Sequence, residues 1–481
     1  MTGSNKEAPT IVWFRRDLRI ADNPALVAAA ERRRPVLPLF ILDMRDRPGK
    51  ASDWWLHGSL SCLSDAFRKR GAGLVLRKGR PEEIIPALAR ETGADAVFWN
   101  RCYEPHAVER DSMLKSSLSE AGVEAKSFAA SLLAEPWEVK TKAGEPYKVF
   151  TPFWKALAAM APFGAPLVPP RKLQGACGPV SDSLEDWKLR PSSPDWAVGF
   201  VKRWTPGEKG AHEFLHRFLE NCADTYGDRR DFPAEESTSR LSPSLHWGEI
   251  SPRQIWAAVE AHRSGNPAAG RSLDKYLSEI AWRDFAYHLI YHWPSIPQEN
   301  WKEGFDRLPW ADDDDAFRRW AAGKTGYPIV DAGMRELWQT GWMHNRVRMI
   351  AASFLVKDLL IHWRRGAEWF EDTLVDADLA VNRASWQWVA GSGADAAPYF
   401  RIFNPVLQGE KFDPGGDYIR RYVPELAELE AKYIHKPWEA PARILAEAGV
   451  MLGETYPYPI VDHGMARERA LKAYEVVKKA S

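Results

Sequence analysis

The segment Asp376–Trp388 carries the side chains with the clearest chemical potential. Asp376 and Asp378 stand two residues apart, as in some metal sites, but no histidine or further acid follows at ligand spacing. The sequence therefore favours another use of these carboxylates. In this interpretation Asp376 pairs with Arg348, and Asp378 accepts a hydrogen bond from a ligand N–H group. Asn382, four residues further on, presents its amide to the same ligand.

A second candidate segment is Trp342–Met349, where an amide, a cation and a thioether occur within about one helical turn. Asn345 is a candidate cap for the helix that follows. Asn345, Arg348 and Met349 then share one face, which suits a ligand with polar and aromatic parts. A capped surface helix is the alternative interpretation.

The third candidate is the run Thr238–Ser242. Thr238, Ser239 and Ser242 are hydroxyl residues, and Arg240 adds a fixed charge. Hydroxyls and free backbone N–H groups near a helix start are good phosphate ligands. The alternative is a helix cap followed by a turn.

The first 135 residues have a different pattern from these segments. Short apolar runs rich in β-branched or aromatic residues alternate there with segments of helical length. This alternation predicts an α/β domain, residues 1–135, with a doubly wound, five-stranded parallel sheet. No GxGxxG follows the first run, which argues against a nicotinamide dinucleotide. The predicted strands are Ile11–Phe14, Val36–Ile41, Leu74–Arg77, Ala96–Asn100 and Glu124–Phe128.

The rest of the chain divides into a connector and a helical domain. Repeated prolines in residues 136–206 prevent long helices, so we predict an ordered connector with one short helix, Val149–Met160. Residues 207–481 show helical apolar spacing and few strand signals, which predicts an all-α domain. The run Asp312–Asp315 fits a solvated helix start. The predicted helices are Ala211–Asn221, Pro252–His262, Leu273–His292, Met334–Thr340, Asn345–Trp363 and Met465–Lys479.

Composition narrows the class of protein. Among 481 residues, 65 basic and 65 acidic side chains balance, so the total charge does not demand nucleic-acid binding. Cys62, Cys102, Cys177 and Cys222 form no CxxC pair, so we expect neither a metal site nor a disulfide framework. Without a visible secretory signal or an apolar run of about 18 residues, we expect a soluble, cytoplasmic, monomeric protein with no membrane partner. The 23 tryptophans suit core packing, stacking on aromatic ligands or electron transfer.

Taken in order along the chain, these motifs resemble the photolyase and cryptochrome family. The resemblance covers nearly the whole sequence. It implies an α/β domain and a long connector, followed by a helical domain that holds FAD. The matching segments are Val12–Arg19 with Asp22–Pro24, Thr238–Ser242, Glu279–Phe285, Lys324–Asp331, Gly341–Met349, Asp376–Trp388 and Tyr399–Pro405.

The resemblance also implies which residues contact FAD. Arg348 would pair with Asp376, and Asn382 would face the flavin N5. Photolyases typically have asparagine there, whereas many signalling cryptochromes have aspartate or another residue. A neutral amide offers the flavin no acid proton, which favours the fully reduced anion. The implied FAD residues are Tyr226, Thr238, Ser239, Arg240, Leu241, Ser242, Tyr276, Arg283, Asn345, Arg348, Asp376, Asp378 and Asn382.

The implied reaction is light-driven repair of cyclobutane pyrimidine dimers in DNA. Excited FADH⁻ gives an electron to a flipped-out dimer, the ring opens, and the electron returns. Trp386, Trp363 and Trp310 match a chain of tryptophans that reduces the flavin, ordered from flavin to surface. Glu279 would hydrogen-bond a base edge. The implied dimer pocket is Glu279, Trp282, Asn345, Met349 and Trp388, and the implied DNA contacts nearby are Arg230, Arg346 and Gln408.

The subclass and the antenna follow from shorter matches. Glu135–Val139 is close to the pattern of plant-type cryptochromes, which favours a bacterial class III photolyase, with class I as the alternative. Class III implies 5,10-methenyltetrahydrofolate as antenna, and an 8-hydroxy-deazaflavin is the alternative. Where some folate-binding class I members have Asn-Glu, this sequence reads His106-Ala107.

Three other functions compete with this interpretation. A cryptochrome-type blue-light photoreceptor is disfavoured by Asn382 and the pocket tryptophans. A 6-4 photoproduct photolyase needs histidine to move a proton to the lesion. Animal-type members read His-His with a further histidine, but this sequence has His344-Asn345 and then Met349, and four scattered cysteines do not fit the iron–sulfur branch. The missing GxGxxG argues against a dinucleotide-dependent oxidoreductase.

Overall fold

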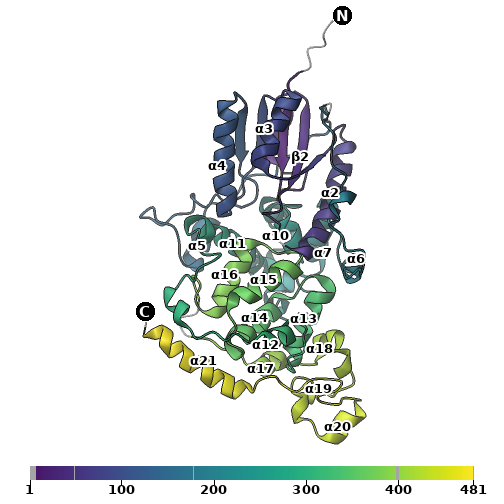
Figure 1. Cartoon of the computed structure of the whole chain (residues 1–481), viewed down its shortest axis with the longest axis vertical. Helices are drawn as coiled ribbons and strands as arrows, with labels where there is room; N and C mark the ends of the chain where they lie inside the picture. Colours follow the sequence, from purple (N-terminus) through teal and green to yellow (C-terminus); the bar gives the residue numbers. More distant parts are fainter. Residues whose placement is uncertain (1–6, 48, 177, 397–399, 480–481) are drawn as a thin grey trace, which may run out of the picture. The chain divides into compact units, whose positions relative to one another are not determined.

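The computed structural model describes residues 7–47, 49–176, 178–396 and 400–479. Cys177, Tyr399 and residues 480–481, named above, lie outside this part. The chain forms two compact units, each assembled from separate stretches, and each is described by itself (Figure 1). Unit 1 comprises residues 1–195, 204–224 and 239–294, and unit 2 comprises residues 196–203, 225–238 and 295–481.

Unit 1 contains a five-stranded parallel sheet with the strand order β3-β2-β1-β4-β5. Thr10 lies opposite Val36 of the second strand and Ala96 of the fourth. All residues of β1, β2 and β4 are buried, as expected for a parallel sheet covered on both faces. The predicted sheet is confirmed, with strand ends within one residue of the prediction. The strands are β1 (Thr10–Phe14), β2 (Val36–Leu42), β3 (Val75–Lys78), β4 (Ala96–Asn100) and β5 (Glu124–Phe128).

Alternate strand residues pack against helices on opposite faces of this sheet. The covering helices are α1 (Pro24–Glu31), α2 (Lys50–Arg68), α3 (Pro81–Thr92) and α4 (Pro105–Glu120) (Figure 1). Trp13 and Trp99 share a buried cluster with side chains of α3 and α4. Phe14, the next residue of β1, instead meets Phe67 of α2, with ring centroids 5.3 Å apart. The strands are thus buried from both sides by different helices.

Beyond the sheet, unit 1 is helical. Glu249 ties this part to α2, because its buried carboxylate accepts hydrogen bonds from Trp55 Nε1 (3.0 Å), Ser59 Oγ (2.5 Å) and the Gly207 N–H (2.6 Å). Burial raises the pKa of Glu249 above its usual value. The elements are α5 (Phe150–Ala158), the 3-10 turn η1 (Glu185–Trp187), α7 (Glu208–Asn221), α9 (Ser242–His246), α10 (Pro252–Gly265), the 3-10 turn η3 (Pro267–Ala269) and α11 (Gly270–His292).

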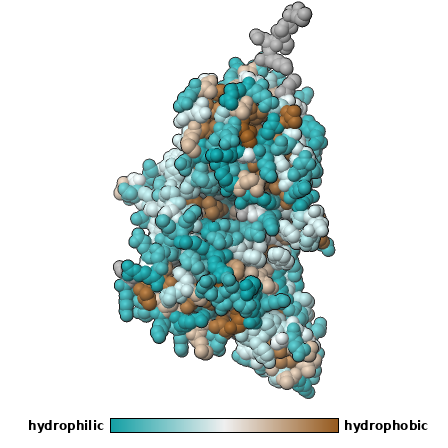
Figure 2. Space-filling model, viewed as in Figure 1, coloured by the Kyte–Doolittle hydropathy of each residue, from teal (hydrophilic) through white to brown (hydrophobic). Residues whose placement is uncertain are grey.

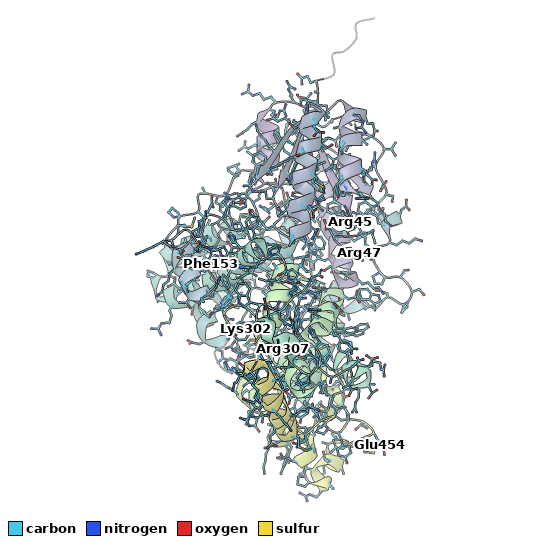
Figure 3. The ribbon with its side chains drawn as sticks, turned by 60° about the vertical axis from the view of Figure 1, so that its left-hand side comes forward. Arg45, Arg47, Phe153, Lys302, Arg307 and Glu454 are labelled. Atoms are coloured by element: carbon cyan, nitrogen blue, oxygen red, sulfur yellow. The ribbon has the colours of Figure 1, made fainter. Side chains whose placement is uncertain are left out.

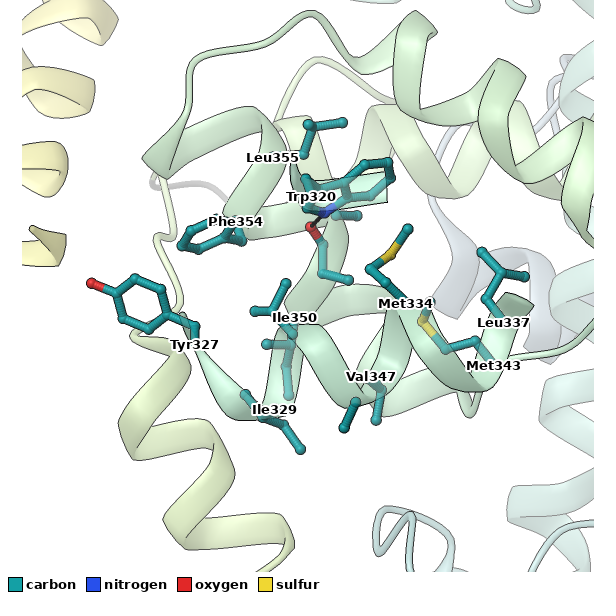
Figure 4. Close-up of a cluster of buried hydrophobic side chains, with 14 of the residues drawn as sticks. Trp320, Tyr327, Ile329, Met334, Leu337, Met343, Val347, Ile350, Phe354 and Leu355 are labelled. Atoms are coloured by element: carbon teal, nitrogen blue, oxygen red, sulfur yellow. Dashed lines mark hydrogen bonds between the residues drawn. The ribbon is translucent and has the colours of Figure 1, made fainter. Parts of the chain in front are cut away.

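Unit 2 is built from helices and short 3-10 turns, which confirms the predicted all-α character. Its core includes Trp320, whose indole N–H donates to the Ala351 carbonyl at 3.0 Å (Figure 4). The helices are α6 (Val198–Arg203), α8 (Tyr226–Arg229), α12 (Asp314–Ala321), α13 (Pro328–Thr340), α14 (Asn345–Ser353), α15 (Trp363–Thr373), α16 (Leu379–Ala390), α17 (Pro405–Phe412), α18 (Asp417–Tyr422), α19 (Ala431–Ile434), α20 (Ala442–Glu447) and α21 (His463–Lys478). The 3-10 turns are η4 (Glu303–Arg307), η6 (Pro424–Leu426) and η7 (Pro437–Glu439), and η2 (Ala223–Thr225) ends where the chain enters unit 2.

The prediction of one helix over Asn345–Trp363 is wrong. After α14 the chain widens into one π-helical turn, η5 (Phe354–Asp358), and then leaves the helix. Leu360 adopts a left-handed backbone conformation with φ of 56°, which a regular helix does not allow. His362 then caps α15, because its Nδ1 accepts from the Arg364 N–H at 3.1 Å. Continuous apolar spacing concealed this break.

Two acidic residues of unit 2 show what two of the sequence segments named above do in the structure. Asp331 is fully buried and accepts from the Thr325 N–H (2.7 Å), the Gly326 N–H (3.0 Å) and the Tyr456 hydroxyl (2.7 Å), so Lys324–Asp331 is a structural motif. Asp313 caps α12 by accepting from the Ala316 N–H at 2.9 Å. This confirms the predicted helix start.

Figure 2 shows a face that is mainly hydrophilic, with hydrophobic residues in small separate groups. Among the described residues, no helix combines the length and the apolar character needed to cross a membrane.

Candidate active site

In unit 2, the predicted pairing of Arg348 with Asp376 is present. The Arg348 Nη2 lies 3.1 Å and 2.8 Å from the two Asp376 carboxylate oxygens, and its Nε donates to the Met343 carbonyl at 2.7 Å. The Asp376 side chain is 3% exposed and that of Arg348 23%. The pair thus links α14 to the turn before α16, and the partly open guanidinium can still reach a ligand.

Asp378 and Asn382 lie at the start of α16, shortly after Asp376. Asp378 caps α16 by accepting from the Val381 N–H at 3.1 Å. Asn382 lies one turn later and is 9% exposed. Its amide nitrogen donates to the Ala367 carbonyl at 3.0 Å and to a Glu371 carboxylate oxygen at 3.2 Å. The amide nitrogen is therefore committed to the protein, and the amide oxygen is the atom that can serve a ligand.

The start of α14 differs from the prediction that Asn345 caps it. His344 is the cap, because its Nδ1 accepts from the Arg346 N–H at 3.2 Å, and Asn345 is the first helical residue. Burial lowers the pKa of His344 to about 3, so the ring is neutral at pH 7. Asn345 is left exposed, with Met349 one turn further along the same helix, as the sequence predicted.

Sequence analysis missed a buried carboxylate that holds this region in place. Glu336 of α13 is 2% exposed and accepts from the His344 N–H (3.1 Å), the Tyr418 hydroxyl (2.6 Å) and the Tyr422 hydroxyl (3.1 Å). Burial and this carboxylate raise the pKa of Tyr422 to about 12, so its hydroxyl stays a donor. In the sequence, Glu336 is visible only as a glutamate one turn before the end of α13. A glutamate at such a position is typical of a solvated helix face, so the sequence did not reveal its burial.

The predicted DNA contacts of unit 2 fall on neighbouring elements. Arg346 Nη2 donates to Asp231 at 2.7 Å, and its guanidinium lies 4.3 Å from the ring centre of Phe412. Gln408 precedes Phe412 by one turn of α17. Arg230, beside Asp231, lies 5.3 Å from the ring centre of the predicted flavin contact Tyr226. The structure thus places Arg346, α17 and the 226–231 segment together.

The three predicted electron-transfer tryptophans are packed to different depths. Trp386 and Trp363 are 2% and 0% exposed, and Trp310 is partly buried. His362 lies between two of them, with ring centroids 4.7 Å from Trp310 and 5.7 Å from Trp363. A Cβ on Gly366 would stand 2.2 Å from the Trp386 ring, so glycine is needed there. Trp388, two residues after Trp386, donates its indole N–H to the Asp395 carbonyl at 3.1 Å.

In unit 1, the Ser239–Ser242 run has a backbone suited to anions. Arg240 is left-handed, with φ of 53°, and Leu241 follows in the right-handed region, with φ of −84° and ψ of −2°. Such a succession turns consecutive N–H groups toward one point. The helix that follows, α9, is only five residues long. Anion binding here would therefore depend on the turn more than on the end of this helix. Thr238, the first residue of the predicted run, belongs to unit 2.

Helix α11 carries the other predicted flavin contacts of unit 1. Tyr276 is 3% exposed, and burial raises the pKa of its hydroxyl above the usual value. Arg283 Nη1 donates to the Ser131 carbonyl at 2.6 Å. Its neighbour Asp284 accepts from the Leu133 N–H at 2.7 Å, and burial raises the pKa of Asp284 to about 7. Arg283 and Asp284 therefore also hold the 131–133 segment on α11.

Two predicted lesion contacts lie one turn apart on α11. Trp282 stacks on Phe150 of α5, with ring centroids 3.6 Å apart and planes at 10°. Glu279 pairs with Lys275 at 2.8 Å on the partly exposed side of the helix. An aromatic platform beside a carboxylate suits a base, which has a flat face and a hydrogen-bonding edge.

Unit 1 also has an open cavity at the carboxyl ends of β1 and β2. His106 and Ala107 line it, so the dipeptide singled out by the sequence does face a cavity. The basic side chains here are paired with acids: His106 and Arg110 with Asp46, and Arg47 with Asp53. Figure 3 labels Arg47 on the segment that follows β2. Within the described residues, no cluster of three or more histidine, cysteine or acidic side chains could hold a metal.

Comparisons with known proteins match both halves of the chain. A family model described as DNA photolyase matches residues 10–171, and one described as the FAD binding domain of DNA photolyase matches residues 276–476. A deoxyribodipyrimidine photo-lyase of Agrobacterium fabrum is 54% identical, over 99% of this chain and 100% of its own length. The chain belongs to the DNA photolyase family. The resemblance predicted from the motifs, and FAD as the cofactor, are thereby confirmed.

Proteins named as photolyases and proteins named as cryptochromes both match the chain. The crystal structure of a bacterial class III photolyase from Agrobacterium tumefaciens matches with a TM-score of 0.97 and 54% identity, covering 100% of this chain and 99% of that one. Cryptochrome-2 of Arabidopsis thaliana is 40% identical over 98% of this chain and 79% of its own length. The photo-lyase relative, at 54% identity, is thus more similar to this chain than this cryptochrome is, which supports the predicted repair of cyclobutane dimers.

The residues present fit the flavin that the family binds. The left-handed turn at Arg240 has a backbone shape that is typical of anion-binding turns. Arg348, neutralised by Asp376, supplies a fixed donor, and Asn382 supplies an amide oxygen whose nitrogen is held elsewhere. Within unit 2, a fixed donor and an amide oxygen are groups that suit the polar edge of an isoalloxazine ring, and within unit 1 the turn suits a phosphate.

Arg348→Ala is expected to purify with far less FAD than the native protein. The change leaves Asp376 charged and buried without its partner, at a local cost of about 3 kcal/mol. Flavin absorbance per protein measures the loss. Arg335→Ala is the matched control, because it removes a comparable ion pair with Glu425 in the same unit. Native flavin occupancy in Arg348→Ala would contradict the assignment.

Asn382→Asp is expected to place a protonated carboxyl beside the flavin. The new carboxyl would meet the Ala367 carbonyl and the Glu371 carboxylate, which repel a negative charge, so its pKa should lie above the ordinary value of about 4. The flavin spectrum during reductive titration should then differ from the native spectrum and change with pH.

Adding Glu371→Gln to this variant should lower the pKa of the new carboxyl. The acid would then lose its proton at lower pH, and the pH profile of the spectra should shift in the acid direction. Identical spectra in the native protein and in Asn382→Asp, at every pH, would count against a place for this residue at the flavin.

Proposed function

We propose that the protein repairs cyclobutane pyrimidine dimers in DNA in a light-dependent reaction. The relative that is 54% identical over nearly both full lengths is a deoxyribodipyrimidine photo-lyase. The structural observation that carries the proposal is Asn382, a neutral amide whose nitrogen is held by Ala367 and Glu371. Such a group stabilises a reduced flavin without supplying an acid proton.

We further propose a role for each predicted residue. FAD, when bound in its fully reduced form, supplies the light-driven electron that opens the cyclobutane ring. Trp282 and Trp388 pack against the faces of the flipped-out dimer, and Glu279 accepts from a base edge. Asn345 and Met349 complete the pocket with a polar and an apolar surface. The residues proposed to hold FAD are Tyr226, Thr238, Ser239, Arg240, Leu241, Ser242, Tyr276, Arg283, Asn345, Arg348, Asp376, Asp378 and Asn382.

The proposed DNA contacts are Arg230, Arg346 and Gln408. Arg346 is bound to Asp231 and lies over Phe412, so its guanidinium is oriented before DNA arrives. A DNA phosphate would share this cation with Asp231, and a charge-assisted hydrogen bond would fix the DNA backbone. Contacts of this kind position the lesion without reading sequence.

The choice of lesion is proposed on the chemistry of α14. A 6-4 photoproduct requires a proton, and His344 is the histidine nearest the predicted pocket residues Asn345 and Met349 in the chain. Its Nδ1 caps α14 and burial lowers its pKa to about 3, so the ring is neutral and cannot act as an acid at neutral pH. The pocket residues instead suit two pyrimidines that need an electron alone.

The remaining assignments belong to the same proposal and rest on the family resemblance. We propose class III, because Glu135–Val139 follows the plant-cryptochrome pattern, and 5,10-methenyltetrahydrofolate as antenna. An 8-hydroxy-deazaflavin is the alternative antenna. We also propose that the protein is a monomer, that it lies in the cytoplasm, and that it acts on ultraviolet-damaged DNA. The functional divisions are residues 1–135, 136–206 and 207–481.

Trp386→Phe is expected to abolish photoreduction of oxidised FAD while sparing repair by chemically reduced protein. Phenylalanine keeps a ring against Phe370, 5.0 Å away in the native protein, but is much harder to oxidise than tryptophan. Flavin absorbance under blue light is the measurement. Trp438→Phe, a change elsewhere in unit 2, should photoreduce normally. Native photoreduction in Trp386→Phe would remove this residue from the electron path.

DNA with one defined lesion tests the function itself. Light-dependent conversion of a cyclobutane dimer, and no conversion of a 6-4 photoproduct, is the expected result for protein with fully reduced FAD. Conversion of the 6-4 lesion alone would overturn the assignment of lesion. Conversion of neither would favour the cryptochrome alternative, to which the 40% identical Arabidopsis relative points.

A further inference from the structure

The ring of His362 contacts two of the three tryptophans that are predicted to carry electrons. Its centroid lies 4.7 Å from that of Trp310, with the ring planes at 54°, and 5.7 Å from that of Trp363, with the planes at 32°. All three rings belong to unit 2. The family resemblance assigns a role to each tryptophan but none to the histidine between them.

Helix capping explains one atom of His362 and leaves the rest of its ring unexplained. Its Nδ1 caps α15 by accepting from the Arg364 N–H at 3.1 Å. Asparagine, aspartate, serine and threonine make such a cap with smaller side chains, as Asp313 does for α12. A cap therefore requires one acceptor atom, whereas the imidazole also supplies a contact surface for two indoles.

The imidazole is neutral in the place where electrons would pass. Burial and the Arg364 guanidinium lower the pKa of His362 to about 4, against the opposing effect of Asp306. The ring therefore carries no charge at pH 7. Because Nδ1 accepts a hydrogen bond, the proton of the neutral ring is on Nε2. A neutral ring does not repel the positive charge that an oxidised indole carries.

Trp363 and Trp310 differ in how costly a positive charge on the indole is. Trp363 is 0% exposed, and the Arg364 guanidinium lies 5.8 Å from its ring centre. Burial and a nearby cation both raise the cost of oxidising Trp363. Trp310 is only partly buried, so water can stabilise a positive charge there. These differences favour moving the charge from Trp363 to Trp310.

We propose that His362 is the bridge through which an electron passes from Trp310 to Trp363 during photoreduction. The proposal rests on the proposed function, which is the source of the roles of the tryptophans. Once Trp363 has given an electron toward light-excited, oxidised FAD, one electron moves from the Trp310 ring to the Trp363 ring. Trp363 is thereby restored, and Trp310 is oxidised by one electron. No bond forms or breaks, and His362 keeps its proton.

The imidazole would act as a packed medium and not as a stopping point for the electron. Imidazole is harder to oxidise than indole, so the electron does not come from His362 itself. Electron transfer between separated rings slows steeply where a gap or water replaces packed atoms. A ring in contact with both indoles therefore supports a faster transfer than a small side chain at the same position.

Two substitutions separate the ring of His362 from its cap. His362→Asn keeps an acceptor for the Arg364 N–H and removes the ring, whereas His362→Phe keeps a ring and removes the acceptor. The melting temperature should therefore fall more in His362→Phe. The long-lived absorbance of oxidised tryptophan after a blue flash should instead be lost in His362→Asn and kept in His362→Phe. A capping role alone predicts that both measurements fall together in His362→Phe.

Trp310→Phe is the reference variant, because electron transfer in it stops at Trp363 and the separated charges recombine early. His362→Asn should show the same early recombination. The double variant should lose nothing further, since both changes interrupt one step. A native lifetime of oxidised tryptophan in His362→Asn would overturn the bridge. A further loss in the double variant, or a loss in His362→Phe as large as that in His362→Asn, would also overturn it.

Two controls keep this test independent of folding and of the proposed function. FAD content reports whether each variant folds, and His362→Ser, another small cap, replaces His362→Asn should that variant lose its flavin. Should the native protein form no long-lived oxidised tryptophan, or should Trp386→Phe form it normally, the proposed electron path itself fails. If both behave as expected and His362→Asn matches the native protein, only the bridge is overturned. Repair of a cyclobutane dimer by chemically reduced native protein tests the proposed function separately.

Discussion

The ion pair between Arg348 and Asp376 is the interaction on which the candidate site in unit 2 depends. It joins two segments that are separate in sequence, the beginning of α14 and the turn before α16. Each charge is costly to bury alone, so the two segments have one low-energy alignment. That alignment sets where the side chains of α14 and those of α16, including Asn382, point relative to each other. Breaking the ion pair would therefore free the side chains of both helices from their mutual alignment, and would not remove one contact alone.

Buried acids support the rest of the structure in the same way, by gathering donors from separate segments. Glu336 receives hydrogen bonds from the His344 backbone and two tyrosines of α18. Asp331 receives them from the 325–326 turn and from Tyr456. Glu249 performs this role in unit 1. Of the three, Glu336 bears most directly on the candidate site, because it fixes the residue that caps α14, and α14 carries Asn345 and Arg348.

How far the sequence predicted this structure depended on whether the determining pattern was local. The strands were found within one residue, and for β1, β2 and β4 the reason is that strands buried on both faces are continuous apolar runs. The Arg348–Asp376 pair was predictable from opposite charges on motifs in a fixed order. The break in Asn345–Trp363 was not, because the left-handed Leu360 carries no signal in an apolar stretch. The role of Glu336 depends on distant segments, so spacing along one helix could not reveal it.

The left-handed turn at Arg240 has a consequence for how this protein can vary over evolutionary time. The anion contact proposed for it would depend on main-chain N–H groups, which every residue except proline carries. The side chains of the turn can therefore drift while the phosphate contact persists, within limits set by the backbone. Residue 240 must tolerate positive φ, which favours glycine and asparagine and disfavours β-branched residues. Selection would thus act here on permitted backbone shapes more than on chemical identity.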